Sequence, residues 1–105
     1  MKTISVQNYE ELRADNVPHV LLDVRENDER TLCVIENDVH IPLGEIGSRH
    51  SELDPDSKVI IYCRSGVRSS QAARFLETVG FDDVYNLEGG ILAWGKEIDQ
   101  SIKPY

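Results

Sequence analysis

Short apolar runs alternate with helix-like stretches along the whole chain. Short strands are predicted at residues 4–6, 19–24, 39–41, 58–62 and 83–87. The apolar run within 19–24 is continuous rather than alternating, which is typical of a strand covered on both faces. Helical stretches are predicted at residues 28–32, 45–49, 69–79 and 91–98. Alternation of this kind predicts an α/β fold, with a mostly parallel central sheet and helices on both faces.

Two local patterns indicate where one helix starts and which face of another is buried. A first helix is predicted to start at Asn8, where Glu11 stands three residues later as in a capping box. In the long helix near the middle of the chain, Ala72, Leu76 and Val79 share one face. This face is expected to pack against the sheet.

The strand at 58–62 runs directly into Cys63-Arg64-Ser65-Gly66-Val67-Arg68, and a helical stretch follows at once. One thiol therefore lies in a tight turn between a strand and a helix. The helix N-terminus directs free N–H groups and the positive end of its dipole into this turn, and two arginines add cationic charge. Such surroundings lower the pKa of a thiol, and the thiolate is the nucleophilic form of cysteine. The pattern predicts that Cys63 is a nucleophile beside an anion-binding site.

A less specific interpretation of the same turn exists. Cys63 would be a half-buried structural thiol at the end of a strand, as single cysteines usually are. Arg64 and Arg68 would then be solvated surface charges. Two arginines beside one sulfur are poorly suited to simple packing, so the nucleophile interpretation is favoured.

The sequence Cys-Arg-Ser-Gly-Val-Arg-Ser at residues 63–69 resembles the active-site loop of the rhodanese-like sulfurtransferases. Residues 21–26, 40–46 and 80–94 resemble other segments of the same family, in the same order. The resemblance spans almost the whole chain. It implies a rhodanese-like fold and the activity of a sulfurtransferase.

The resemblance also implies a mechanism. In that family the loop cysteine takes the outer sulfur of a donor such as thiosulfate, becomes a persulfide, and passes the sulfur to a nucleophilic acceptor, so Cys63 would be the catalytic carrier. The substrate-binding residues that it implies form the rest of the turn: Arg64, Ser65, Gly66, Val67 and Arg68. Their backbone N–H groups would hold the anionic sulfur, and the guanidinium forks would orient an oxyanion. Gly66 would let the backbone turn without a Cβ clash.

Two alternatives to a sulfurtransferase remain. Phosphatases of the cell-cycle dual-specificity type use a related fold, but their loop is longer than the four residues between Cys63 and Arg68, and Tyr62 replaces the histidine of their signature. Phosphatase or arsenate reductase activity is therefore the minor alternative. The other is a non-catalytic or regulatory interaction module, although inactive family members usually lose the loop cysteine that this chain keeps.

The chain departs from the family between residues 29 and 42. Val34 and Asn37 stand where histidine and glycine are common. That histidine is not the nucleophile, so the departure concerns the wall beside the active site and not the chemistry. Cys33, in the same segment, is interpreted as a structural thiol because free cysteines are commonly buried.

Composition limits the remaining possibilities. The length of 105 residues predicts one domain, residues 1–105. With 11 basic against 19 acidic residues the net charge is −8, which argues against nucleic acid or an anionic membrane as a partner. No leader pattern or membrane-length apolar run is found, so a cytoplasmic location is expected. The spacing of the two cysteines predicts neither a disulfide scaffold nor a metal site, and no cofactor is expected.

The partners that we expect follow from the same charges. Arg64 and Arg68 would form a positive mouth on a negative body, which attracts small anions more than polyanions. A small anionic sulfur donor is therefore the expected partner. A cysteine desulfurase or a sulfur-carrier protein is the alternative source or recipient of the sulfur.

Overall fold

The computed structural model describes residues 1–105 as five strands and five α-helices. The strands are β1 (Lys2–Ile4), β2 (Val20–Asp23), β3 (Val39–His40), β4 (Val59–Tyr62) and β5 (Val84–Leu87). The α-helices are α1 (Val6–Ala14), α2 (Asn27–Arg30), α3 (Ile46–Arg49), α4 (Val67–Thr78) and α5 (Gly90–Glu97). Two 3₁₀ turns, Leu43–Glu45 and His50–Glu52, flank α3.

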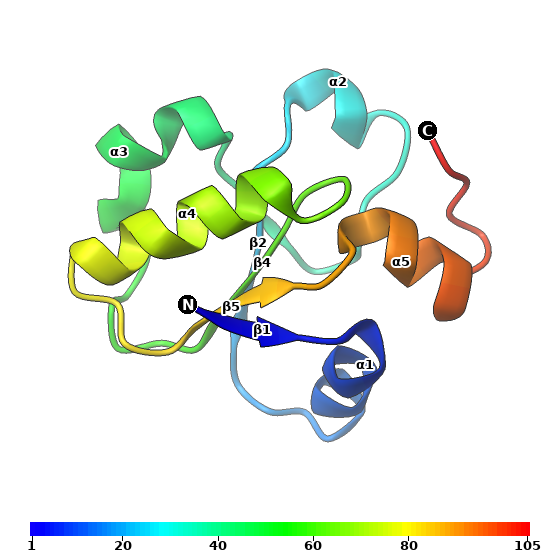
Figure 1. Cartoon of the computed structure of the whole chain (residues 1–105), viewed down its shortest axis with the longest axis horizontal. Coiled ribbons are helices and arrows are strands. Elements are labelled where there is room, and N and C mark those ends of the chain that lie inside the picture. The colour runs from blue at the N-terminus through cyan, green and yellow to red at the C-terminus, as the bar shows by residue number, and fades with distance from the viewer.

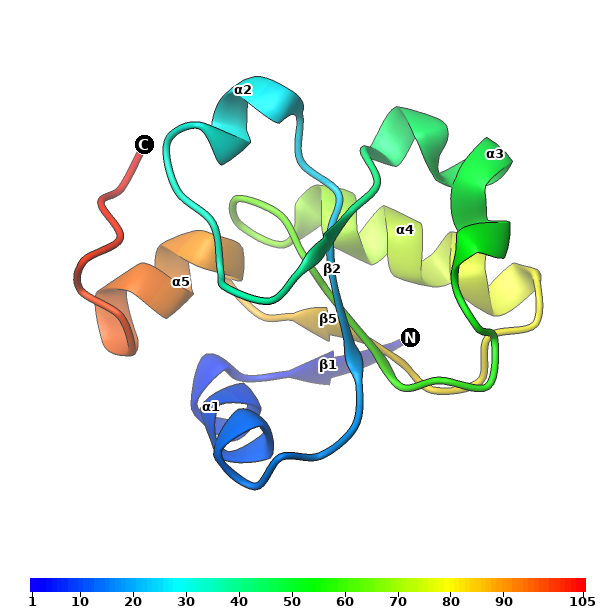
Figure 2. The ribbon, with the colours of Figure 1, turned by 180° about the vertical axis from the view of Figure 1, so that it is seen from behind.

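The strands form one sheet in the order β1-β5-β4-β2-β3, and every pair is parallel. Helices α3 and α4 cover one face, and α1 and α5 cover the other (Figures 1 and 2). This confirms the predicted α/β fold with helices on both faces. None of the helices combines the length and the apolar character needed to cross a bilayer.

The central strand β4 divides its side chains between the two layers. Val59 and Ile61 belong to the core under α3 and α4, and Cys63, just beyond the strand, continues this alternation. Ile60 and Tyr62 point into the core shared with α1 and α5. Cys63 therefore emerges on the α4 side, at the carboxyl end of a central strand, where open α/β sheets bind ligands.

The sequence placed the first strand and the start of the first helix too far along the chain, so this prediction is wrong. Strand β1 ends at Ile4, and Ser5 is the N-cap of α1, its hydroxyl accepting a hydrogen bond from the N–H of Asn8 at 3.1 Å. Asn8 is thus inside the helix. The earlier start buries Val6 and Tyr9. Ser5 and Asn8 could both cap a helix, and this burial favours Ser5.

Helix α4 starts at Val67 and not at residue 69. Gly66, at φ +111°, lets the loop turn directly into the helix. Ala72 and Leu76 are fully buried as expected, but Val79 is the C-cap residue and is 37% exposed, so it does not belong to the buried face. The other predicted elements are present, with ends shifted by one or two residues.

Candidate active site

The loop between β4 and α4 wraps around the sulfur of Cys63, which is only 1% exposed. Its Sγ accepts hydrogen bonds from the backbone N–H groups of Gly66 at 3.1 Å and Ser69 at 3.4 Å. The Ser69 hydroxyl lies 3.3 Å from the same sulfur. Burial disfavours the charged form, but hydrogen bonds from Ser69, Gly66 and Ser65 outweigh it and lower the pKa of Cys63. The loop therefore holds a thiol that ionises readily.

Ser69 and Asn86 belong to this site and were missed from the sequence. The Ser69 hydroxyl donates to Asn86 Oδ1 at 2.5 Å, and Asn86 Nδ2 donates to the carbonyl of Gly66 at 3.0 Å. Asn86 thus fixes both the loop and the hydroxyl. The available signals were a polar residue within the otherwise buried strand β5 and a hydroxyl in the first turn of α4.

The N-terminus of α5 holds the loop from the other side. The N–H of Ile91 donates to the carbonyl of Cys63 at 2.9 Å, and that of Leu92 donates to the carbonyl of Arg64 at 3.1 Å. Gly90 makes this approach possible, because a Cβ on it would lie 2.5 Å from the Arg64 oxygen and 2.6 Å from the Cys63 oxygen. Its φ of +60° also favours glycine.

These contacts take up the carbonyl groups of the loop and leave part of its N–H groups available. The N–H groups of Arg64, Val67 and Arg68 have no acceptor within the protein. Successive N–H groups in a tight turn before a helix form a concave anion site. The loop can therefore accept an anion beside Cys63.

The two arginine side chains of the loop already have partners. Arg68 makes a two-pronged ion pair with Glu29, Nη1 to Oε1 at 2.6 Å and Nη2 to Oε2 at 2.9 Å. Arg64 lies over the ring of Tyr105, 5.3 Å from its centroid, and donates to the Tyr105 carbonyl oxygen. Of the other predicted site residues, Ser65 and Val67 have exposed side chains at the loop rim.

Asp23 and Arg25 have a structural role. Both side chains are fully buried and form an ion pair at 3.0 Å. Arg25 Nη2 also donates to the carbonyl of Cys33 at 2.8 Å, and Arg25 Nη1 donates to the Tyr105 hydroxyl at 3.0 Å. This cluster holds the end of β2 and ties it to the C-terminal segment, which runs from α5 to the vicinity of α2 (Figure 1).

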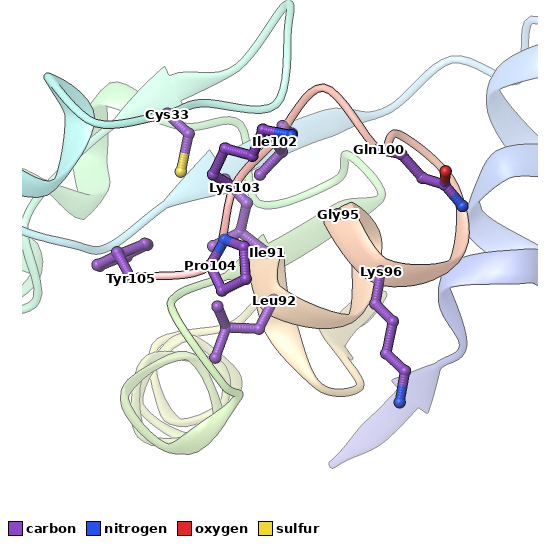
Figure 3. A pocket seen from close by; sticks show the side chains of 10 residues that line it. All are labelled: Cys33, Ile91, Leu92, Gly95, Lys96, Gln100, Ile102, Lys103, Pro104 and Tyr105. Atoms are coloured by element: carbon purple, nitrogen blue, oxygen red, sulfur yellow. The ribbon is translucent and has the colours of Figure 1, made fainter.

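Cys33 lies apart from the loop, in the wall of a cavity of about 380 Å³ between α5 and the C-terminal segment. Figure 3 shows its sulfur together with Ile91, Leu92 and Tyr105. Cys63 is not among the lining residues. Asn37, in the same atypical segment, has φ +66°, which explains why glycine would suit that position and why asparagine, which tolerates this region, can replace it.

Comparisons with known proteins agree with this geometry. A model of the rhodanese-like domain matches residues 5–97. YtwF of Bacillus subtilis (strain 168), provisionally named a sulfurtransferase, is 40% identical over 84% of this chain and 84% of its own. A sulfurtransferase of Allochromatium vinosum is 41% identical over 79% of this chain and 78% of its own.

Structural similarity points the same way. The crystal structure of a rhodanese-like domain protein from Staphylococcus aureus superposes with a TM-score of 0.87 at 30% identity, covering 100% of this chain and 99% of that one. The family model and the two sequence relatives support a sulfurtransferase role in general terms. The chain belongs to the family of rhodanese-like domains.

Proposed function

We propose that this protein transfers sulfane sulfur through a persulfide on Cys63. The observation that carries the proposal is the pair of backbone N–H groups, of Gly66 and Ser69, that donate to Sγ, with the Ser69 hydroxyl 3.3 Å from the same sulfur. Burial alone would keep the thiol neutral, yet these donors lower the pKa of Cys63. A thiolate prepared in this way is a nucleophile and also a good leaving group.

With thiosulfate as donor, the Cys63 thiolate attacks the outer sulfur. A sulfur–sulfur bond to Cys63 forms as the bond inside thiosulfate breaks, and sulfite leaves with the electron pair. In the second step an acceptor thiolate attacks the outer sulfur of the Cys63 persulfide. The acceptor becomes a persulfide and the Cys63 thiolate is regenerated, so no external oxidant or reductant is consumed.

The loop supports each step with groups that are already in place. The N–H groups of Arg64, Val67 and Arg68 have no acceptor within the protein and would hold the donor anion or the charged outer sulfur. The side chains of Arg64 and Arg68 would steer an anionic donor toward the loop. Ser65 and Val67 would line the entrance and Gly66 would shape it. A cysteine desulfurase or a sulfur-carrier protein would serve as donor or acceptor in the same two steps.

Intact-mass analysis of the purified protein tests this function. After incubation with thiosulfate, the chain should gain the mass of one sulfur atom, and a reductant should remove it. Cys63→Ser should gain nothing while keeping a normal circular-dichroism spectrum, whereas the matched variant Cys33→Ser should gain the sulfur as the unmodified chain does. Sulfur carried by Cys63→Ser would refute the proposal. A chain that takes no sulfur from thiosulfate or from a desulfurase would instead be a binding module.

A further inference from the structure

The partner of Arg68 is itself an anion. Both oxygens of the Glu29 carboxylate accept from the guanidinium fork, at 2.6 and 2.9 Å. This is the geometry in which a guanidinium binds the oxyanion of a ligand. Glu29 therefore already occupies the donors of Arg68 that an anionic sulfur donor would use.

Glu29 is held firmly in this position. The Tyr105 hydroxyl donates to its Oε2 at 2.7 Å, and the N–H of Glu26 donates to its Oε1 at 3.1 Å. Its side chain is 15% exposed, against 32% for that of Arg68. The hydrogen bonds from Arg68, Tyr105 and Glu26 lower the pKa of Glu29 to about 2, so the carboxylate is charged near neutral pH. The pair of Glu29 and Arg68 is therefore more firmly held than an ion pair between two exposed side chains.

We propose that Glu29 determines donor specificity by competing with the donor for Arg68. The inference rests on the proposed sulfur transfer and names the kind of donor preferred. A small free dianion, such as thiosulfate, depends on the guanidinium groups for affinity and must displace Glu29. A persulfide brings a single charged sulfur that the loop N–H groups hold without Arg68. Glu29 thus weakens the binding of small dianions relative to thiol persulfides, including those carried on a protein.

Sulfate is the probe that tests this competition without any sulfur transfer. Bound in the loop, sulfate should protect Cys63 from iodoacetamide, which peptide mass analysis follows at that residue alone. Glu29→Gln keeps the shape and removes the charge, and it should tighten sulfate binding by about fivefold, corresponding to a partly buried ion pair. Glu36→Gln makes the same change of net charge at an exposed side chain without a partner, and it should leave the binding unchanged.

A double variant separates competition for Arg68 from a general effect of charge. In an Arg68→Ala background, Glu29→Gln should tighten sulfate binding no more than Glu36→Gln does. Glu29→Ala should act as Glu29→Gln does, which guards against a folding defect specific to one substitution. Weaker or unchanged sulfate binding in both Glu29 variants would overturn the proposal, and so would an equal gain without Arg68.

Kinetics extend the test to donors. In Glu29→Gln the KM for thiosulfate should fall by about fivefold, while the KM for glutathione persulfide should stay within about twofold of its original value. An equal change for both donors would overturn the specificity. A chain whose Cys63 acquires no sulfur would refute the proposed function, and the sulfate measurements would still report whether Glu29 competes for Arg68.

Discussion

The two cysteines differ in the hydrogen-bond donors around their sulfurs, and we expect these donors, and not exposure, to decide which thiol reacts. Cys33 is the more exposed of the two, and no group donates a hydrogen bond to its sulfur. Cys63 is 1% exposed, yet its sulfur accepts from the N–H groups of Gly66 and Ser69. Burial without donors keeps a thiol neutral, whereas burial among donors prepares a thiolate.

The surroundings of the two sulfurs arise from different parts of the fold. The Cys63 loop is fixed on one side by the start of α4 and on the other by the start of α5. The Cys33 segment is held through its backbone, where the carbonyl of Cys33 accepts from Arg25. The contacts of the Cys63 loop therefore position its sulfur atom, whereas the contact of the Cys33 segment positions only its main chain.

The largest effect on Cys63 is expected when the contact between its loop and the start of α5 is removed. Gly90→Ala would place a Cβ 2.5 Å from the Arg64 carbonyl oxygen, at a φ of +60°, where the backbone cannot yield cheaply. We expect the free energy of unfolding to fall by about 2–4 kcal/mol, and persulfide formation to be lost. Denaturant titration measures the first and intact mass the second.

Gly44→Ala is the matched control, since a Cβ there meets nothing within 4 Å. It should change the free energy of unfolding by less than about 1 kcal/mol and leave sulfur uptake intact. Equal stability of Gly90→Ala and the unmodified chain would show that the contact between α5 and the loop does not constrain Cys63.

A second prediction compares the thiols directly. Near neutral pH, iodoacetamide should alkylate Cys63 at least about tenfold faster than Cys33, because the thiolate is the reacting form. Burial opposes ionisation, but the donors lower the pKa of Cys63, so its rate should reach a plateau at a lower pH than that of an unperturbed cysteine. Peptide mass analysis across pH, in Cys33→Ser and Cys63→Ser, measures both rates. A faster reaction at Cys33 would contradict the assignment of the nucleophile.

Much of the fold could be predicted because the two central strands, β2 and β4, are short and almost continuously apolar. The run before Cys63 is buried on both faces, which is why it has no polar alternation. The boundary at Ser5 was not predictable in the same way. Ser5 and Asn8 are both good N-caps, and only the burial of Val6 and Tyr9 in three dimensions decides between them.

The site was predictable where its parts are adjacent in sequence. Cys63, the tight turn and the helix N-terminus follow one another, so their proximity is certain from the chain itself. Asn86, Glu29 and Tyr105 come from distant segments, and the sheet order alone brings them to the loop. The arginines were expected to face the sulfur, but their side chains lie against Glu29 and Tyr105.

A third prediction concerns the donor that the sequence did not reveal. Ser69→Ala removes the hydroxyl beside Cys63 and keeps the N–H of residue 69. In the thiolate form this hydroxyl can turn its proton from Asn86 to the sulfur, so its loss should raise the pKa of Cys63. The alkylation profile of Cys63 would then move to higher pH, and the rate near neutral pH would fall by about tenfold.

Ser70→Ala is the control for that change. The Ser70 hydroxyl donates only to the carbonyl of Val67, so its loss should leave the profile of Cys63 unchanged. Identical profiles for Ser69→Ala and Ser70→Ala would mean that the backbone N–H groups alone stabilise the thiolate.

The smallest effect is expected at the arginines, and it distinguishes an exposed contact from a partly buried one. Arg64 is held at the surface by the main-chain oxygen and ring of Tyr105, whereas Arg68 is held in a partly buried, two-pronged pair with the carboxylate of Glu29. A donor anion displaces an exposed contact more easily than a partly buried ion pair. Arg64→Ala should therefore raise the KM for thiosulfate by about threefold and Arg68→Ala by about twofold or less. Arg74→Ala, on the exposed side of α4, should have no effect. A larger effect at Arg68 than at Arg64 would mean that the donor displaces Glu29 from Arg68 readily. Unchanged KM values in both variants would mean that the backbone N–H groups alone bind the donor.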